Sequence, residues 1–246
     1  YFLFVQLPLF LPLDFMAKHD KYAATYTTEH NRRAKYLTGF DLDYFNRYKI
    51  KDLEDECVQH SIYKPKKIMD FGCGVGNSLP LINELFPMAS IFGFDVSSKS
   101  IKLAKEKTKT IKNIYASHIE KTIFSSQPTY DIIFSSCVFH HIDSSERTHW
   151  LKQLYSNLKP GGILLIYEHN PINPLTQFIF RTDEADKEGS MISSRRLKMI
   201  LMEAGFINIF TRYRVYFPSF LTSLIRFEDY LKVLPLGAQY YCFAVK

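Results

Sequence analysis

Residues 66–78, with the sequence KKIMDFGCGVGNS, decide the fold of this chain. The apolar run at 68–71 is typical of a buried parallel strand. Three glycines at alternate positions predict a sharp main-chain turn that a ligand can approach without meeting a Cβ. Pro80 follows closely, and proline is tolerated in the first turn of a helix because no hydrogen-bonded N–H is lost there. A strand, a glycine loop and a helix start in this order predict a nucleotide pocket.

The residues around this loop indicate which nucleotide it takes. Asp95 follows Gly76 by 19 residues, a spacing that suits a carboxylate accepting hydrogen bonds from two ribose hydroxyls. The glycines read G-x-G-x-G and lack the G-x-G-x-x-G spacing of a pyrophosphate site. Asp70, just before the loop, would oppose a diphosphate and favour an ammonium group. S-adenosylmethionine (SAM) carries an ammonium, a sulfonium and no phosphate, so the local chemistry favours SAM over NAD.

The sequence resembles the class I SAM-dependent methyltransferases over about residues 66–170. Five motifs in the family's order carry the resemblance: DFGCGVGN (70–77), GFDVS (93–97), YDIIFSS (130–136), VFHHI (138–142) and LKPGG (158–162). The resemblance implies a Rossmann-like α/β fold, with a seven-stranded, mostly parallel sheet covered by helices on both faces. It also implies a C-terminal hairpin with an antiparallel strand.

SAM is the cofactor that the resemblance implies, with S-adenosylhomocysteine as its product. We expect Asp95 to accept from the ribose hydroxyls, the main chain of 72–76 to accommodate the methionine portion, and Asp70 to act on its ammonium. Many family members carry an acid after the third strand to bind the adenine amino group, whereas this chain has Ser117-His118-Ile119 there. The residues predicted to bind the cofactor are Asp70, Gly72, Cys73, Gly74, Gly76, Asn77, Asp95, Val96, Ser97, Ser117, His118, Ile119, Ser136 and Cys137.

Four residues near the ends of the fourth and fifth expected strands are candidates for acid–base catalysis. They are His140, His141, Glu168 and His169. Ligands of open α/β sheets bind beyond the carboxyl ends of the strands, which places these side chains near the methyl donor. The alternative for each is a structural role, with the ring bonded to main chain or the carboxylate holding its loop. We predict no metal site, because adjacent histidines diverge and no carboxylate is spaced in the sequence to join them.

The chain divides into three predicted parts. Residues 1–15 are an apolar leader without a signal-peptide pattern. We interpret this leader as a disordered segment, a non-native segment or a membrane-dipping anchor. Residues 16–64 predict a helical lid over the cofactor. Residues 65–246 predict the SAM-binding domain, in which 218–239 form an insertion that shapes the acceptor pocket or a homodimer contact. The charged segment 181–190 is expected to be exposed over that pocket.

Composition narrows the class of protein further. A 46% hydrophobic and 23% charged composition is ordinary for a soluble domain, and no membrane span is expected. The net charge of +6 comes partly from lysines in one expected helix, without aromatic interleaving, so no nucleic-acid partner is expected. The four cysteines include no C-x-x-C pair, which indicates reduced thiols in a cytoplasmic protein.

The sequence therefore predicts a SAM-dependent methyltransferase acting on a small-molecule acceptor by in-line displacement. The reactive donor leaves the protein mainly the task of holding donor and acceptor in line, and a base is needed only for a protonated nucleophile. O- and N-methylation both remain open, with a sugar or a secondary metabolite as the suggested acceptor. One alternative is a catalytically silent SAM-binding regulator or scaffold. The other, an NAD-dependent oxidoreductase, is disfavoured by the glycine spacing and Asp70.

Overall fold

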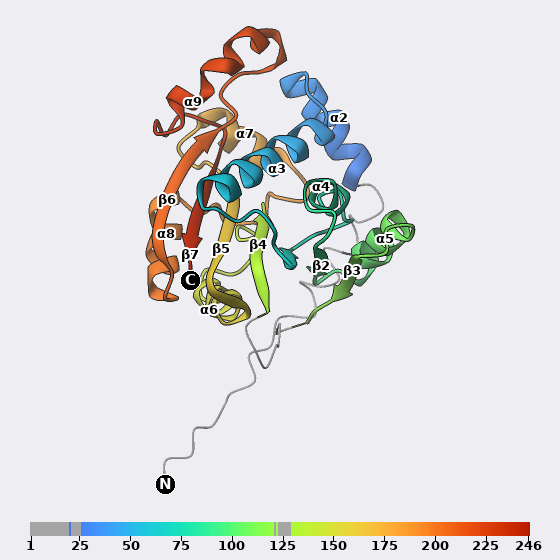
Figure 1. The fold of residues 1–246 in the computed structure, drawn as a ribbon. Helices are drawn as coiled ribbons and strands as arrows, with labels where there is room; N and C mark the ends of the chain where they lie inside the picture. The colour runs from blue at the N-terminus through green and yellow to red at the C-terminus, as the bar shows by residue number, and fades with distance from the viewer. Residues whose placement is uncertain (1–19, 21–25, 121, 123–128) are drawn as a thin grey trace.

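The chain forms a seven-stranded sheet flanked by helices (Figure 1). A computed structural model describes residue 20, residues 26–120, residue 122 and residues 129–246. The strands are β1 (Lys67–Phe71), β2 (Ser90–Asp95), β3 (Ile114–His118), β4 (Tyr130–Ser136), β5 (Leu158–His169), β6 (Ile207–Arg214) and β7 (Gln239–Val245). The helices are α2 (Tyr26–Thr38), α3 (Leu42–Gln59), α4 (Leu79–Leu85), α5 (Ser98–Thr108), α6 (Arg147–Asn157), α7 (Pro174–Thr182), α8 (Ser194–Glu203), the 3-10 helix η1 (Ser219–Phe227) and α9 (Glu228–Leu231).

The strand order is β3-β2-β1-β4-β5-β7-β6. The strands from β3 to β5 pair in parallel, while β7 runs antiparallel to both β5 and β6. The central strands are nearly continuous apolar runs, as expected where both faces of a sheet are covered. The predicted Rossmann-like fold and its antiparallel C-terminal strand are confirmed.

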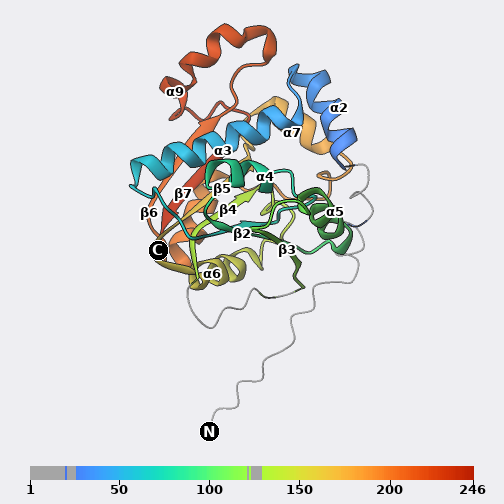
Figure 2. The same ribbon diagram turned by 45° about the vertical axis from the view of Figure 1, so that its right-hand side comes forward.

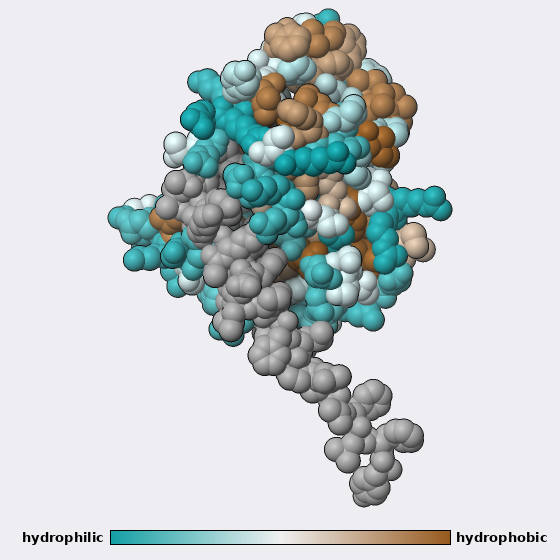
Figure 3. Space-filling model, turned by 180° about the vertical axis from the view of Figure 1, so that it is seen from behind, coloured by the Kyte–Doolittle hydropathy of each residue, from teal (hydrophilic) through white to brown (hydrophobic). Residues whose placement is uncertain are grey.

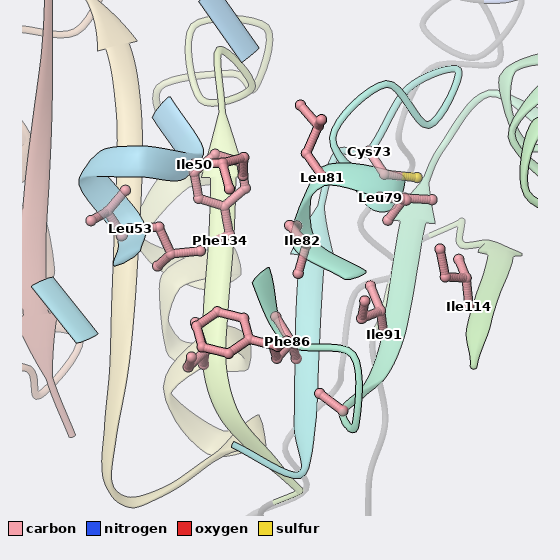
Figure 4. Close-up of a cluster of buried hydrophobic side chains, with 14 of the residues drawn as sticks. Ile50, Leu53, Cys73, Leu79, Leu81, Ile82, Phe86, Ile91, Ile114 and Phe134 are labelled. Carbon is pink, nitrogen blue, oxygen red and sulfur yellow. The ribbon is translucent and has the colours of Figure 1, made fainter. Parts of the chain in front are cut away.

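Helices cover both faces of the sheet (Figure 2). One buried cluster joins α3, α4 and α5 to the sheet, and Figure 4 shows Ile50 and Leu53 of α3 beside Phe134 of β4. The opposite cluster joins α6 and α8, with Trp150 and Leu197 fully or almost fully buried. Burying such side chains contributes roughly 1.5–3 kcal/mol each, so the two layers fix the strand ends that carry the polar residues described below.

Side-chain caps start several helices. Ser97 accepts from the N–H of Ser100 and caps α5, and Ser193 and Asn173 cap α8 and α7 in the same way. Before α6, the carboxylate of Asp143 binds the N–H and hydroxyl of Ser145 in a turn, and the helix begins two residues later.

The LKPGG motif forms the start of the fifth strand, because β5 begins at Leu158. Leu158 pairs with Tyr130 before a register shift, and Gly161, with a φ of 75°, donates its N–H to the Lys246 carbonyl. The motif is therefore an irregular strand start that anchors the C-terminal residue.

In Figure 1, α2 and the inserted segment lie toward the top of the view, and α3 crosses in front of the strands. Helices α2 and α3 match the helical prediction for 16–64, while the predicted leader at 1–15 lies outside the described residues. The insertion forms η1 and α9, and brown side chains gather over it in Figure 3. Its exposed large apolar residues are Phe220, Phe227, Tyr230, Val233, Leu234 and Leu236. A dimer contact there stays a prediction. In the part of the chain that is described, no helix has the length and hydropathy of a membrane span.

Candidate functional site

A cavity of about 270 Å³ lies beyond the carboxyl ends of β1, β4 and β5. The glycine loop forms one wall, and α2 and α3 form another. The remaining lining comes from α7, the 183–186 segment and the start of β7. Nine predicted site residues line it: Asp70, Gly72, Cys73, Gly74, Asn77, Ser136, Cys137, His141 and His169. The structure therefore brings most of the glycine-loop prediction together with two of the four proposed catalytic residues.

Close packing explains the glycines of the loop. Gly72 has a φ of 76°, and a Cβ there would lie 2.2 Å from Cγ2 of Val138. The N–H groups of Gly72 and Cys73 both donate to the carbonyl of Phe94, which ties the loop to β2. Gly74, with a φ of 53°, would have nothing within 4 Å of its Cβ, so it faces open space. The loop is thus pinned at its start and open at its middle.

Asp70 is a buried carboxyl group at the floor of the cavity, 2% exposed. It accepts a short hydrogen bond from the hydroxyl of Ser78. Burial raises its pKa to about 7, against the lowering effect of Ser78 and with a further rise from the nearby Asp95. A carboxyl in this state gains most from a ligand that brings a positive charge.

Asp95 stands at the end of β2, outside the cavity lining. Its Oδ2 accepts from the N–H of Gly74 and its Oδ1 from the N–H of Ser97, both at 2.8 Å. Burial raises its pKa, while these two N–H groups lower it. The carboxylate thus holds the glycine loop and the start of α5, in addition to the ribose contact that the sequence predicts.

The other residues predicted for the adenine side lie beside Asp95. Ring nitrogen Nε2 of His118 is 3.0 Å from the carbonyl of Val96, and the N–H of Ile119 donates to the carbonyl of Asp95. The hydroxyl of Ser97 donates to the carboxylate of Asp20 at 2.6 Å. Gly76, Val96, Ser97, Ser117, His118 and Ile119 do not line the cavity. Their roles toward a cofactor stay predictions.

Sequence reasoning missed a row of buried charges on α3. Lys49, Asp52 and Glu56 are all less than 9% exposed and share the inward face. The carboxylate of Asp52 binds Arg214 at 2.8 Å and the hydroxyl of Tyr167, and Glu56 accepts from another tyrosine hydroxyl, on β7. These residues are three and four positions apart, the same spacing as the apolar face of the helix, and this spacing could have predicted that they point inward.

Lys49 is the member of this row that reaches the cavity. Its Nζ donates to Oγ of Ser136 at 2.8 Å and contacts Sγ of Cys137 at 3.6 Å. Cys137 has a φ of 58°, an uncommon conformation for a residue with a side chain. Burial opposes its thiolate, but Lys49 and His169 outweigh that effect and lower the pKa of Cys137 to about 6. The ammonium of Lys49 thus favours the thiolate form of Cys137 at the end of β4.

Glu168 and His140, two of the predicted acid–base residues, are fully or almost fully buried, and neither lines the cavity. Glu168 accepts from the N–H groups of Val138 and Phe139 and from Nδ1 of His140, so it holds the loop after β4. Burial opposes protonation of His140, but Glu168 and Asp186 outweigh it and raise its pKa to about 10. These contacts favour the structural alternative for this pair, and a catalytic role for either residue stays a prediction.

Asp186 is a second residue that the sequence did not reveal. We expected 181–190 to be exposed, yet Asp186 is only 15% exposed and faces His140, His141 and His169 at 3.4, 3.5 and 3.7 Å. These histidines lower its pKa against the effect of burial. The premise that no carboxylate joins the histidines is therefore wrong. The carboxylate of Asp186 lies beside them, although Asp186 is 45 residues after His141 in the sequence and no local spacing predicts the contact.

A family model described as a methyltransferase domain matches residues 42–209, more than half of the chain. The chain belongs to this methyltransferase family. It is 27% identical over 137 residues to a trans-aconitate 2-methyltransferase of Rhodopseudomonas palustris, covering 56% of this chain and 52% of that protein. It is 31% identical over 128 residues to a malonyl-acyl-carrier-protein O-methyltransferase of Halalkalibacterium halodurans, covering 50% and 46%.

The solved structure of a SAM-dependent methyltransferase from Archaeoglobus fulgidus superposes with a TM-score of 0.60 and 18% identity, covering 80% of this chain and 94% of that one. That likeness concerns the fold. The chain spans about half the length of the curated relatives it matches. The predicted class I methyltransferase family is confirmed, and membership in it disfavours the NAD-dependent alternative.

Proposed function

We propose that this methyltransferase-family chain binds SAM and transfers its methyl group to an acidic oxygen of a small-molecule acceptor held in the cavity. The observation that carries the proposal is the buried carboxyl of Asp70 under an open glycine loop, with Lys49 across the same cavity. SAM is the cofactor of the family, and when bound it supplies a methyl group activated by the sulfonium.

The donor residues fit this cofactor. Asp70 in its ionised form would pair with the ammonium of the methionine portion, and the open main chain at Gly74 would let the chain of that portion approach. Asp95, already bonded to that N–H and to Ser97, would keep the loop in place while accepting from the ribose. We assign no diphosphate to the site, because Asp70 would repel it.

The acceptor side is described by its charges. Lys49 lines the cavity and would attract and orient a carboxylate or another acidic oxygen, with His141 as a neighbouring hydrogen-bonding group. An already ionised oxygen needs no general base, which fits the burial of Glu168 and His140 away from the cavity. The names of the relatives above, with trans-aconitate and a malonyl group, point the same way. A sugar or a secondary metabolite as the acceptor stays a prediction.

Helices α2 and α3 would act as the lid predicted for 16–64. Arg33 of α2 lines the cavity and donates to the carbonyls of Ile179 and Thr182 at the end of α7. Opening the cavity on this side would break those bonds. The α2 part of the lid is thus held to the end of α7 by polar contacts that an acceptor could replace, while α3 is packed on the sheet.

Methyl transfer is tested by incubating the protein with SAM bearing a deuterated methyl group and panels of carboxylic acids, hydroxyl compounds and amines. We expect S-adenosylhomocysteine and a labelled ester in the carboxylic acid panel. Labelled amines alone would refute the acidic-oxygen assignment. Binding of S-adenosylhomocysteine with no methyl consumed in any panel would instead favour the silent regulator or scaffold.

A further inference from the structure

His140, His141 and Asp186 bring three metal-binding atoms within 4.8 Å of one another, with His141 and Asp186 at the cavity wall and His140 buried behind them. Oδ1 of Asp186 lies 3.4 Å from Nε2 of His140 and 3.5 Å from Nε2 of His141. A tetrahedral ion with bonds of about 2.0–2.1 Å has ligand atoms about 3.3–3.4 Å apart. We propose that these three residues bind one divalent transition-metal ion of the zinc type.

His140 is oriented as a metal ligand would be. Its Nδ1 lies 2.7 Å from Oε2 of Glu168, an acceptor, so Nδ1 carries a proton, and a metal ion would bind at Nε2 in place of the second proton that the imidazolium carries there. Glu168 is in turn fixed by the N–H groups of Val138 and Phe139. A carboxylate behind the imidazole is the arrangement that commonly orients histidines at metal centres.

The free face of His140 gives an independent indication. Nε2 is buried, makes no hydrogen bond, and points toward the carboxylate of Asp186. Buried polar atoms of native proteins nearly always have a hydrogen-bond partner or a bound ion. We therefore expect a bound group between this nitrogen and Asp186. With neutral imidazoles, Asp186 and Glu168 carry two negative charges, which one divalent cation balances.

The donor set indicates the class of ion. Two imidazole nitrogens and one carboxylate oxygen suit Zn²⁺ and its first-row neighbours, whereas Mg²⁺ and Ca²⁺ prefer oxygen ligands alone. Three protein ligands leave the fourth tetrahedral position open. His141 and Asp186 both line the cavity, so that position faces the proposed acceptor. On the proposed function, the ion would bind the acceptor oxygen and orient it.

The other charged groups at the cluster fit a supporting role. Nε2 of His169 lies 3.7 Å from Oδ2 of Asp186, beyond hydrogen-bond distance but within range of electrostatic attraction. His169 also interacts with the thiol of Cys137, and it is a positioning residue in this arrangement. The ring of Phe180 packs edge-on against both His140 and His169 and limits their rotation.

Cobalt titration of the metal-stripped full chain tests the site, because tetrahedral Co²⁺ absorbs visible light strongly. We expect one Co²⁺ per chain, displaced by Zn²⁺ and not by Mg²⁺ or Ca²⁺. His141→Ala and Asp186→Asn change partly exposed side chains and should each weaken binding about 100-fold. The matched control is His149→Ala, an exposed histidine on α6 that should bind as the parent does.

The outcomes separate this proposal from the proposed function. Equal Co²⁺ binding by the parent and the two ligand variants would place the ion elsewhere and overturn the proposal. Absence of a tetrahedral spectrum in the parent would overturn it as well, and would mean that a proton fills the gap between His140 and Asp186. S-adenosylhomocysteine binding, measured separately on the same samples, reports whether each variant is folded and whether the cofactor assignment stands.

Discussion

Replacing Asp70 by Asn should stabilise the unliganded protein at high pH and weaken its binding of S-adenosylhomocysteine. Burial raises the pKa of Asp70 from 3.8 to about 7. When the pKa of a carboxyl is higher in the folded than in the unfolded state, folding favours its protonated form. Its contribution to the free energy of unfolding is complete below the unfolded pKa and is lost as the pH rises through the folded pKa. At about 1.36 kcal/mol per pKa unit, ionised Asp70 costs about 4 kcal/mol above pH 7.

Urea unfolding of both proteins between pH 5 and pH 8 measures this effect. Asn carries no ionisable charge, so the free energy of unfolding of the variant minus that of the parent should grow by about 2–3 kcal/mol across this range. Asp131→Asn is the control, because this carboxyl is ionised in the folded and the unfolded state throughout the range, so the change in stability should be the same at pH 5 and pH 8. The pKa of Asp131 is lowered because, although burial raises it, Lys159 and the N–H groups of Lys66 and Lys67 outweigh that effect. A pH-independent difference for Asp70→Asn would refute the reasoning.

Binding should show the matching trend. An ammonium partner favours ionised Asp70, so the affinity of the parent for S-adenosylhomocysteine should rise between pH 5.5 and pH 7.5 with release of a proton. The Asp70→Asn variant should bind more weakly and lose this dependence. The two measurements together separate the electrostatic role of Asp70 from a general loss of structure.

Three further predictions concern the cavity wall and the elements behind it. Arg214→Leu leaves the carboxylate of Asp52 buried without its cationic partner and should lower the free energy of unfolding by about 3–5 kcal/mol in urea titrations; a loss under 1 kcal/mol would show that the pair is solvated. Gly76→Ala should cost more stability than Gly74→Ala, because a Cβ at the first would lie 2.9 Å from a side chain of α5 while the second faces open space; equal melting temperatures would contradict the packing. Lys49→Met should lower kcat/KM for acidic acceptors about 100-fold and leave affinity for S-adenosylhomocysteine unchanged; unaltered kinetics would remove Lys49 from the acceptor site.

The cofactor half was readable from the sequence because its determinants are local. The glycines, Asp70 and Asp95 act through main-chain geometry and fixed spacing after a strand, and the order of strands follows from the same pattern. The irregular start of β5 was missed because Gly161 and Gly162 read as a turn, while pairing with β4 and the C-terminal residue draws them into the sheet.

The acceptor half was less readable because its contacts join distant segments. Asp186 reaches three histidines from the segment after α7, and Lys49 reaches Ser136 from α3, 87 residues earlier. No periodic pattern in the sequence predicts either contact. Glu168 illustrates the converse difficulty, because a polar residue at the end of a central strand predicts catalysis and structural anchoring equally. Its burial and its three hydrogen bonds, which favour anchoring, are visible only in the structure.

Calorimetric titration of the full chain with S-adenosylhomocysteine, and separately with NAD, tests the central claim most directly. We expect one binding site for S-adenosylhomocysteine with micromolar affinity and no heat of binding from NAD, because Asp70 opposes a diphosphate and favours an ammonium. Binding of NAD without binding of S-adenosylhomocysteine would contradict the account at its base.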